Sequence, residues 1–154
     1  MGKEMRKNDR SMNEADIVEL LRMTEYGVLS MAGLDSYAYG VPLSYVFLNG
    51  ALYFHSALEG YKWDCIQENN QVSFCVVGET EILPSKFSTK YQSVIVFGQI
   101  TVIEGAEKRE ALIGFLKKYS SEFMEKGLKY LESDEHITRV LKLTIEDMLG
   151  KARR

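Results

Sequence analysis

The sequence has 154 residues, and its hydrophobic content of 45% is enough for a single globular domain spanning residues 1–154. Its formal net charge is −3, but short basic tails at 1–10 and 150–154 flank a strongly acidic body, which argues against a nucleic-acid partner. No apolar run could span a membrane and the N-terminus lacks a secretory signal, so we expect a cytoplasmic protein with no membrane partner.

The first predicted elements are a helix and three β-rich runs. Asn13 is a good N-cap for a helix that ends near Met23, and Met12 is placed to pack on Ile17 as a hydrophobic staple. Short β-rich runs follow at 27–33, 37–48 and 51–57. Between the last two stands Asn49-Gly50, the pair that suits both positive-φ positions of a type I′ turn, so we predict a hairpin there.

The rest of the chain continues to alternate between helices and strands. In order, we expect helix 60–69, strand 71–77, a loop at 78–90, strand 91–104 as the longest strand, helix 106–119, a helical piece at 121–132 and strand 138–147. Five or six strands with hairpin links and a few outer helices indicate a mainly β fold, a small antiparallel barrel with added helices.

The stretch YFHSALEGYKW carries the chain's most suggestive polar groups at a strand-to-helix junction. The helix could begin directly after Ser56, with Ser56 and Glu59 as a capping box, or it could begin at Gly60 with Lys62 in its first turn. In the second case His55, Ser56 and Lys62 would offer a ring donor, a hydroxyl and a charge to a phosphate at the helix N-terminus. A plain alternative stays open, in which Lys62 is a surface lysine and His55 bonds to backbone.

Other catalytic and metal-binding signatures are missing from the sequence. It has no GxSxG, Walker lysine loop, HExxH or Gly-rich dinucleotide motif. Cys65 and Cys75 lack CxxC spacing and the second histidine, His136, lies in a polar run, so we expect reduced structural thiols and no metal site. Any chemistry is then expected to come from a bound cofactor that the protein positions.

Several motifs in order carry a family resemblance, and they read MRKNDRSM, YGVLSMAG, YGVPLSYVFLNGALYFHSALEGYKWDCI, VSFCVVGETEILPSKFSTKYQSVIVFGQ and GKARR. Over nearly its whole length the chain resembles the nitroimidazole-resistance (Nim-type) branch of the pyridoxamine 5′-phosphate oxidase-like, FMN-binding split-barrel proteins. The resemblance implies a six-stranded antiparallel split β-barrel with flanking helices. It also implies a homodimer that binds FMN at the subunit interface.

The resemblance also assigns roles to individual residues. It implies that the flavin ring lies by Pro42, Leu43 and Ser44, and that Ser93 and Val94 approach this ring from the other side of the cleft. It further implies that the ribityl or phosphate end lies near His55 and Ser56. The phosphate itself would lie on Lys62. Tyr61 stands where the Nim-type pattern commonly has a histidine, and its hydroxyl can still donate a hydrogen bond. His55 corresponds to a histidine near the flavin, which suggests a proton donor during reduction.

These implications lead to one main hypothesis and two alternatives. The main hypothesis is a dimeric FMN-dependent oxidoreductase that reduces a small electrophile, with nitroimidazoles as one candidate class. Vitamin B6 synthesis is not predicted, because the later strands show no set of basic residues matching the oxidase's substrate-phosphate site. The alternatives are a non-catalytic flavin-binding or redox-sensing module, and a split barrel that holds haem, with His55 as axial ligand, or a deazaflavin.

Overall fold

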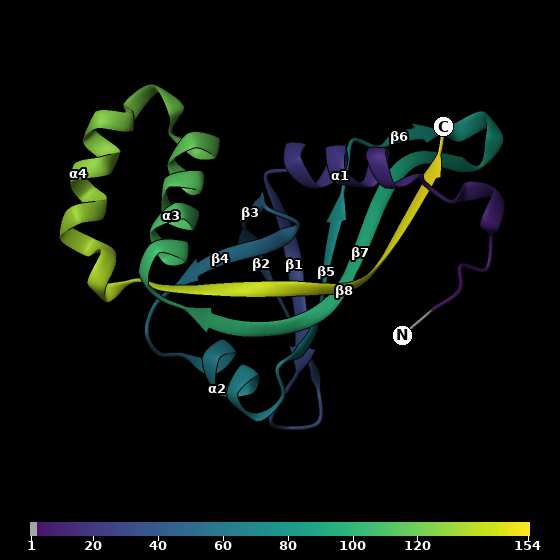
Figure 1. The fold of residues 1–154 in the computed structure, drawn as a ribbon. Helices are drawn as coiled ribbons and strands as arrows, with labels where there is room; N and C mark the ends of the chain where they lie inside the picture. The colour runs from purple at the N-terminus through teal and green to yellow at the C-terminus, as the bar shows by residue number, and fades with distance from the viewer. Residues whose placement is uncertain (1–2) are drawn as a thin grey trace.

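The computed structural model describes residues 3–154, which form eight strands and four α-helices (Figure 1). The strands are β1 (Tyr26–Ala32), β2 (Ala38–Ser44), β3 (Val46–Leu48), β4 (Ala51–Ser56), β5 (Gln71–Val77), β6 (Glu81–Leu83), β7 (Ser88–Ile103) and β8 (Arg139–Arg153). The helices are α1 (Glu14–Met23), α2 (Tyr61–Glu68), α3 (Gly105–Tyr119) and α4 (Met124–Asp134). Short 3-10 turns are η1 (Asn8–Arg10), η2 (Pro84–Lys86), η3 (Ser121–Phe123) and η4 (Glu135–Ile137). None of the helices in this part of the chain has the length and apolar character needed to cross a membrane.

The strands form one antiparallel sheet that curls on itself. Its order is β2-β1-β5-β7-β8-β4-β3, with β6 paired to β7 outside this path. Although β2 and β3 stand at opposite ends of that order, only Tyr45 separates them in the chain, so the two ends of the sheet must meet. The predicted split barrel with flanking helices is therefore confirmed, and its six longer strands are β1, β2, β4, β5, β7 and β8.

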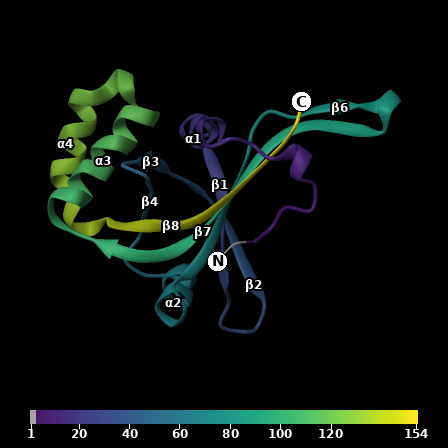
Figure 2. The ribbon, with the colours of Figure 1, turned by 45° about the vertical axis from the view of Figure 1, so that its right-hand side comes forward.

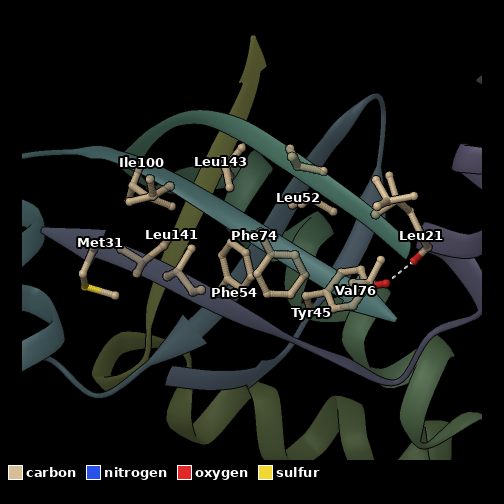
Figure 3. Close-up of a cluster of buried hydrophobic side chains, with 14 of the residues drawn as sticks. Leu21, Met31, Tyr45, Leu52, Phe54, Phe74, Val76, Ile100, Leu141 and Leu143 are labelled. Carbon is tan, nitrogen blue, oxygen red and sulfur yellow. Dashed lines mark hydrogen bonds between the residues drawn. The ribbon is translucent and has the colours of Figure 1, made fainter. Parts of the chain in front are cut away.

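The inner face of the curled sheet holds the main core (Figure 3). The rings of Tyr45 and Phe54 each meet Phe74 edge to face, with centroids 4.9 and 5.0 Å apart. The buried Tyr45 hydroxyl donates a hydrogen bond of 2.5 Å to the carbonyl of Leu21, at the end of α1. The residue that joins the two ends of the sheet is thus fixed by aromatic packing and by a hydrogen bond.

A second apolar cluster lies on the opposite side of β3, β4 and β8, under α3. Its members include Tyr53, Phe115 and Val140. Lys118 of α3 also reaches the sheet, donating hydrogen bonds of 2.7 and 2.8 Å to the carbonyls of Thr24 and Tyr45. Helices α3 and α4 therefore cover one end of the molecule, while β7 and β8 run away from them toward β6 and the C-terminus (Figures 1 and 2).

The locally specified elements match the sequence-based predictions. The Asn13 side chain caps α1 by accepting a hydrogen bond of 2.8 Å from the Asp16 amide. Asn49 and Gly50 have φ values of 52° and 76°, and they join β3 to β4 as the predicted hairpin. The predicted strand 71–77 is β5, and the longest strand is β7 as expected.

Other boundaries were wrong, and in each case strand pairing explains the difference. The run 37–48 is divided at Tyr45 into β2 and β3, and the supposed loop 78–90 contains β6, which pairs with the start of β7. The supposed basic tail 150–154 belongs to β8 as far as Arg153, because β7 continues alongside it. The N-terminal segment also joins this edge through a bridge from Ser11 to Lys151, whereas residues 1–2 lie outside the described chain.

Candidate functional site

The junction between β4 and α2 resolves the question of where the helix starts. α2 begins at Tyr61 with Gly60 as N-cap at a φ of 138°, and no side chain caps it. The Ser56 hydroxyl donates to the carbonyl of Ala57 at 3.0 Å, so the capping-box alternative is wrong. The first-turn amides of α2 are therefore free of side-chain acceptors, and Lys62 lies among them.

His55 and Lys62 are two basic groups at this junction, and the charge of Lys62 perturbs the imidazole of His55. Desolvation lowers the pKa of Lys62, which is half-buried. Desolvation and then the Lys62 charge lower the pKa of His55, although part of its side chain reaches solvent. The His55 ring packs edge to face on Phe115 of α3, with centroids 4.7 Å apart. Both shifts disfavour positive charge, as expected where cations gather without a counterion.

Arg139 is a third basic group here, and the sequence analysis missed it. It is the first residue of β8 and stands opposite Ser56 in the register between β4 and β8. Its guanidinium lies 3.7 Å from the ring centroid of Trp63 on α2. Its Nη1 atom is buried and has no hydrogen-bond partner within residues 3–154. No local motif marks this arginine, since only strand pairing brings it to Ser56.

We refer to the three basic residues of this junction together as the β4–α2 cationic cluster: His55 of β4, Lys62 of α2 and Arg139 of β8. None of them lies within ion-pair distance of a carboxylate in the described chain. A buried guanidinium nitrogen without an acceptor is costly, and a phosphate would supply acceptors to it, to Lys62 and to the open helix N-terminus together. The donor set therefore fits the phosphate of a nucleotide-type cofactor such as FMN.

Tyr61 fixes the turn between β1 and β2 against α2. Its hydroxyl accepts a hydrogen bond of 2.9 Å from the amide of Leu34, and its ring meets Tyr39 edge to face at 4.9 Å. The hydroxyl thus has a backbone partner in the structure, and a direct bond from Tyr61 to a cofactor stays a prediction. The contact brings the far end of β2 to the cationic cluster.

The predicted ring-binding residues on β2 point to two sides of the sheet. Pro42 and Ser44 are exposed, whereas Leu43 packs against the main core. Along the seven residues of β2 the chain covers about 20 Å, leading from Ser44 to the turn held by Tyr61. An elongated ligand with its phosphate at the cationic cluster could therefore lie along this strand.

Pro42 and Ser44 belong to a larger surface, the outer face, made of alternate residues of β2, β1, β5, β7 and β8. Val28 pairs with both Pro42 and Cys75, and Cys75 pairs with Ile95, so these four share one cross-strand row. Ser93 occupies the next row on this face, opposite Val77 and Lys151. Val94 points the other way and is fully buried in the core. The structure thus groups Pro42, Ser44 and Ser93 on one face without showing whether they touch a cofactor.

The outer face is unusually apolar for an exposed surface. Tyr26 and Val77 have exposed fractions of 59% and 52%, and Val28 and Ile95 are also exposed. Tyr26 and Val77 also line a cleft of about 610 Å³ between this face and α1. That volume lies in the range of small-molecule binding sites. The candidate site therefore combines a cationic end, an apolar strip and a neighbouring cleft.

Comparisons with known proteins agree with this geometry. A family model described as pyridoxamine 5′-phosphate oxidase matches residues 13–152. No curated protein matches the sequence.

Solved structures share the fold at low sequence identity. A candidate 5-nitroimidazole antibiotic resistance protein from Bacteroides thetaiotaomicron is 23% identical with a TM-score of 0.73, and the match covers 90% of this chain and 83% of that one. The flavocytochrome Anf3 from Azotobacter vinelandii is 17% identical with a TM-score of 0.80, and the match covers 98% of this chain and 72% of Anf3. An FAD-binding protein from Mesorhizobium loti is 20% identical with a TM-score of 0.66, and the match covers 94% of this chain and 98% of that protein. At these identities the similarity establishes the split-barrel fold alone.

Proposed function

The chain belongs to the pyridoxamine 5′-phosphate oxidase family, and we propose that it is an FMN-dependent oxidoreductase that reduces small electrophiles such as nitroaromatic compounds. The observation that carries the proposal is the β4–α2 cationic cluster, above all the buried and unpartnered Nη1 of Arg139. An FAD-binding protein and a flavocytochrome share the fold, which supports a redox cofactor in general. The donor set suits a phosphate, which a flavin nucleotide carries and haem does not.

In this proposal the chain's own residues hold the cofactor at two ends. Ser56, Lys62 and Arg139 donate to the phosphate together with the first-turn amides of α2. Pro42 and Ser44 flank the ring system on the outer face, and Leu43 supports them from the core side. When bound, FMN supplies the capacity to accept a hydride from a donor and pass electrons to a substrate.

His55 is proposed as the proton donor, and its environment sets the conditions for that role. In the cofactor-free chain desolvation and the Lys62 charge lower its pKa, so the neutral imidazole dominates at neutral pH. A phosphate beside Lys62 would offset that charge and move the pKa of His55 back toward neutrality, where general acid catalysis is most effective. The contact of the His55 ring with Phe115 fixes the orientation of the imidazole.

We further propose that the outer face pairs with a second copy of the chain. This face carries four exposed apolar residues in neighbouring cross-strand rows, Tyr26, Val28, Val77 and Ile95, and contiguous exposed apolar residues often mark protein–protein interfaces. On the same face Asp147 of β8 has a buried carboxylate oxygen with no partner within residues 3–154, which a donor from a second copy could satisfy. A dimer would also place Ser93 of one copy opposite the ring bound on the other.

Substitution of Ile95 tests the dimer. Ile95→Lys places a charge in the centre of the outer face, so we expect a monomer in analytical ultracentrifugation, with much weaker flavin binding. Tyr130→Lys is the matched control, because Tyr130 is an exposed aromatic residue on α4, away from this face. A protein that stays dimeric after Ile95→Lys would show that the outer face is not the interface.

The cofactor itself is tested by the visible spectrum of the purified protein, followed by chromatography of the chromophore released on denaturation. FMN release and bleaching of its bands by NADH or NADPH, with reoxidation by a nitroaromatic compound, would support the oxidoreductase. A flavoprotein that no nucleotide reduces would favour the redox-sensing module. A Soret band would replace FMN by haem, and a protein that takes up no added FMN would refute the proposal.

A further inference from the structure

The N-terminal segment and the end of β8 form a second group of basic residues, distant from the β4–α2 cluster. The amide of Met12 donates a hydrogen bond of 3.0 Å to the carbonyl of Gly150, and Ser11 bridges to Lys151. These contacts dock η1 beside the end of β8, as Figure 1 shows near the C-terminus. Arg10, the last residue of η1, directly precedes Ser11 and therefore lies at the same edge of the sheet as Lys151.

Both cations converge on Tyr91 of β7. The Lys151 ammonium lies 5.9 Å from the centroid of the Tyr91 ring. Desolvation alone would raise the pKa of Tyr91, but the nearby basic side chains of Arg10 and Lys151 outweigh it and lower the pKa. Arg153 stands opposite Tyr91 in the register between β7 and β8, adding a third positive charge to the same edge.

The surrounding acids do not neutralise this group. Two acids lie on the neighbouring elements η1 and β6. Asp9 belongs to η1, as Arg10 does, and Glu81 of β6 pairs with Lys90 of β7 at 3.9 Å. No carboxylate in residues 3–154 lies within ion-pair distance of Arg10, Lys151 or Arg153. The group therefore keeps a net positive charge around a phenol that can donate a hydrogen bond.

The position of this group relates it to the proposed cofactor. Tyr91 is two residues from Ser93 on the same side of β7, about 7 Å along the strand. Arg139, in contrast, is twelve residues from Lys151 on β8, up to about 40 Å along that bent strand. At this separation along the strand, one phosphate does not contact both groups of basic residues on the same chain.

We propose that Arg10, Tyr91 and Lys151 form an anion-binding subsite for the carboxylate or phosphate of the molecule that exchanges electrons at the ring end of the outer face. The inference rests on the proposed function for its role, but not for the existence of the site. A phosphate would come from a nucleotide electron donor, and a carboxylate from the substrate. In both cases the phenol and the two cations converge on an oxyanion.

The subsite can be tested without turnover, in the dimeric protein with tyrosine labelled by ¹³C at Cζ. The Tyr91 resonance is assigned by its loss in Tyr91→Phe, and pyrophosphate and succinate are then titrated separately. We expect a saturable shift of that resonance and a rise in its pKa, since a bound anion opposes phenolate formation. A stronger response to pyrophosphate would indicate the nucleotide donor, and a stronger response to succinate the substrate carboxylate.

Variants separate the subsite from general charge effects and from flavin binding. Lys151→Met is expected to weaken the anion response of Tyr91 by roughly tenfold or more, whereas Lys86→Met on η2 should leave it unchanged. Both variants should keep their FMN content, because neither residue is in the β4–α2 cluster. A Tyr91 signal that ignores both anions, or that responds equally in Lys151→Met, would overturn the inference. A protein that binds anions here but never binds flavin would refute only the proposed function.

Discussion

Replacing Arg139 by methionine should separate a cofactor-binding role from a structural one, because the two roles predict opposite results. The guanidinium contacts the Trp63 ring at 3.7 Å, while its buried Nη1 lacks an acceptor. Methionine keeps much of the apolar volume but removes the charge and the unpaired donor. The variant therefore asks whether the fold or the ligand needs this cation.

The effect of Arg139→Met on the free energy of unfolding can be compared with its effect on the free energy of FMN binding. Removing the unpaired buried donor relieves about 1–3 kcal/mol, and losing the cation–π contact costs about 0.5–2 kcal/mol. These contributions nearly cancel, so the free energy of unfolding of the flavin-free protein should change by no more than about 1 kcal/mol. A charge-assisted hydrogen bond to phosphate is worth about 1.5–3 kcal/mol, so the FMN dissociation constant should rise about tenfold to 150-fold.

Two measurements on the flavin-free protein decide the matter. Urea denaturation gives the free energy of unfolding, and titration of FMN with detection of its fluorescence gives the dissociation constant. Lys142→Met is the matched control, since Lys142 lies on the same strand but its ammonium pairs with Glu107 at 2.8 Å. If Arg139→Met bound FMN with unchanged affinity and lost about 2 kcal/mol or more of stability, Arg139 would be a structural residue and the phosphate argument would fail.

The remaining predictions concern Lys62 and the Asn49-Gly50 turn. Lys62→Met should weaken FMN binding by about 1.5–3 kcal/mol in calorimetry, and in an imidazole NMR titration it should raise the pKa of His55, which desolvation and Lys62 now lower. Because the pKa of His55 in the folded protein is lowered from its ordinary value, its contribution to stability is present above that ordinary value and is lost as the pH falls through the lowered pKa. His55→Gln should remove this acid-side loss in urea denaturation. Gly50→Ala places a Cβ at a φ of 76° and should cost about 1–2 kcal/mol of unfolding free energy, whereas an unchanged stability would mean that the turn is not held in this geometry.

The parts of the fold that could be predicted from the sequence are those whose causes lie within a few residues. Asn13 reaches its own helix amides, and Asn49-Gly50 sets two φ angles that no distant contact has to supply. The split barrel, and the hypothesis of a cofactor phosphate at the junction around Lys62, followed from a resemblance that extends over nearly the whole chain. The family match over residues 13–152 confirms that resemblance.

Strand ends were not predictable in this way, because the partner strand determines where pairing stops. Nothing in the residues after 147 signals a strand, yet β7 provides hydrogen-bonding partners for β8 as far as Arg153. Likewise β6 exists because the start of β7 extends beyond β5 and pairs with it. Basic residues that look like a solvated tail in the sequence are therefore held in register, and Lys151 gains a fixed place beside Tyr91.

Arg139 shows most clearly what pairing adds to the site. In the sequence it follows a polar run and precedes alternating apolar residues, so it looks like an ordinary residue at a strand start. Pairing with β4 places it opposite Ser56, and packing of Trp63 then buries one of its nitrogens. A fold that needed only a surface cation here could leave the guanidinium in water at no desolvation cost. Holding one of its nitrogens buried, without an acceptor and without a carboxylate nearby, raises the free energy of the cofactor-free protein. Binding of a phosphate would offset this cost by giving acceptors to the charges of Arg139 and Lys62.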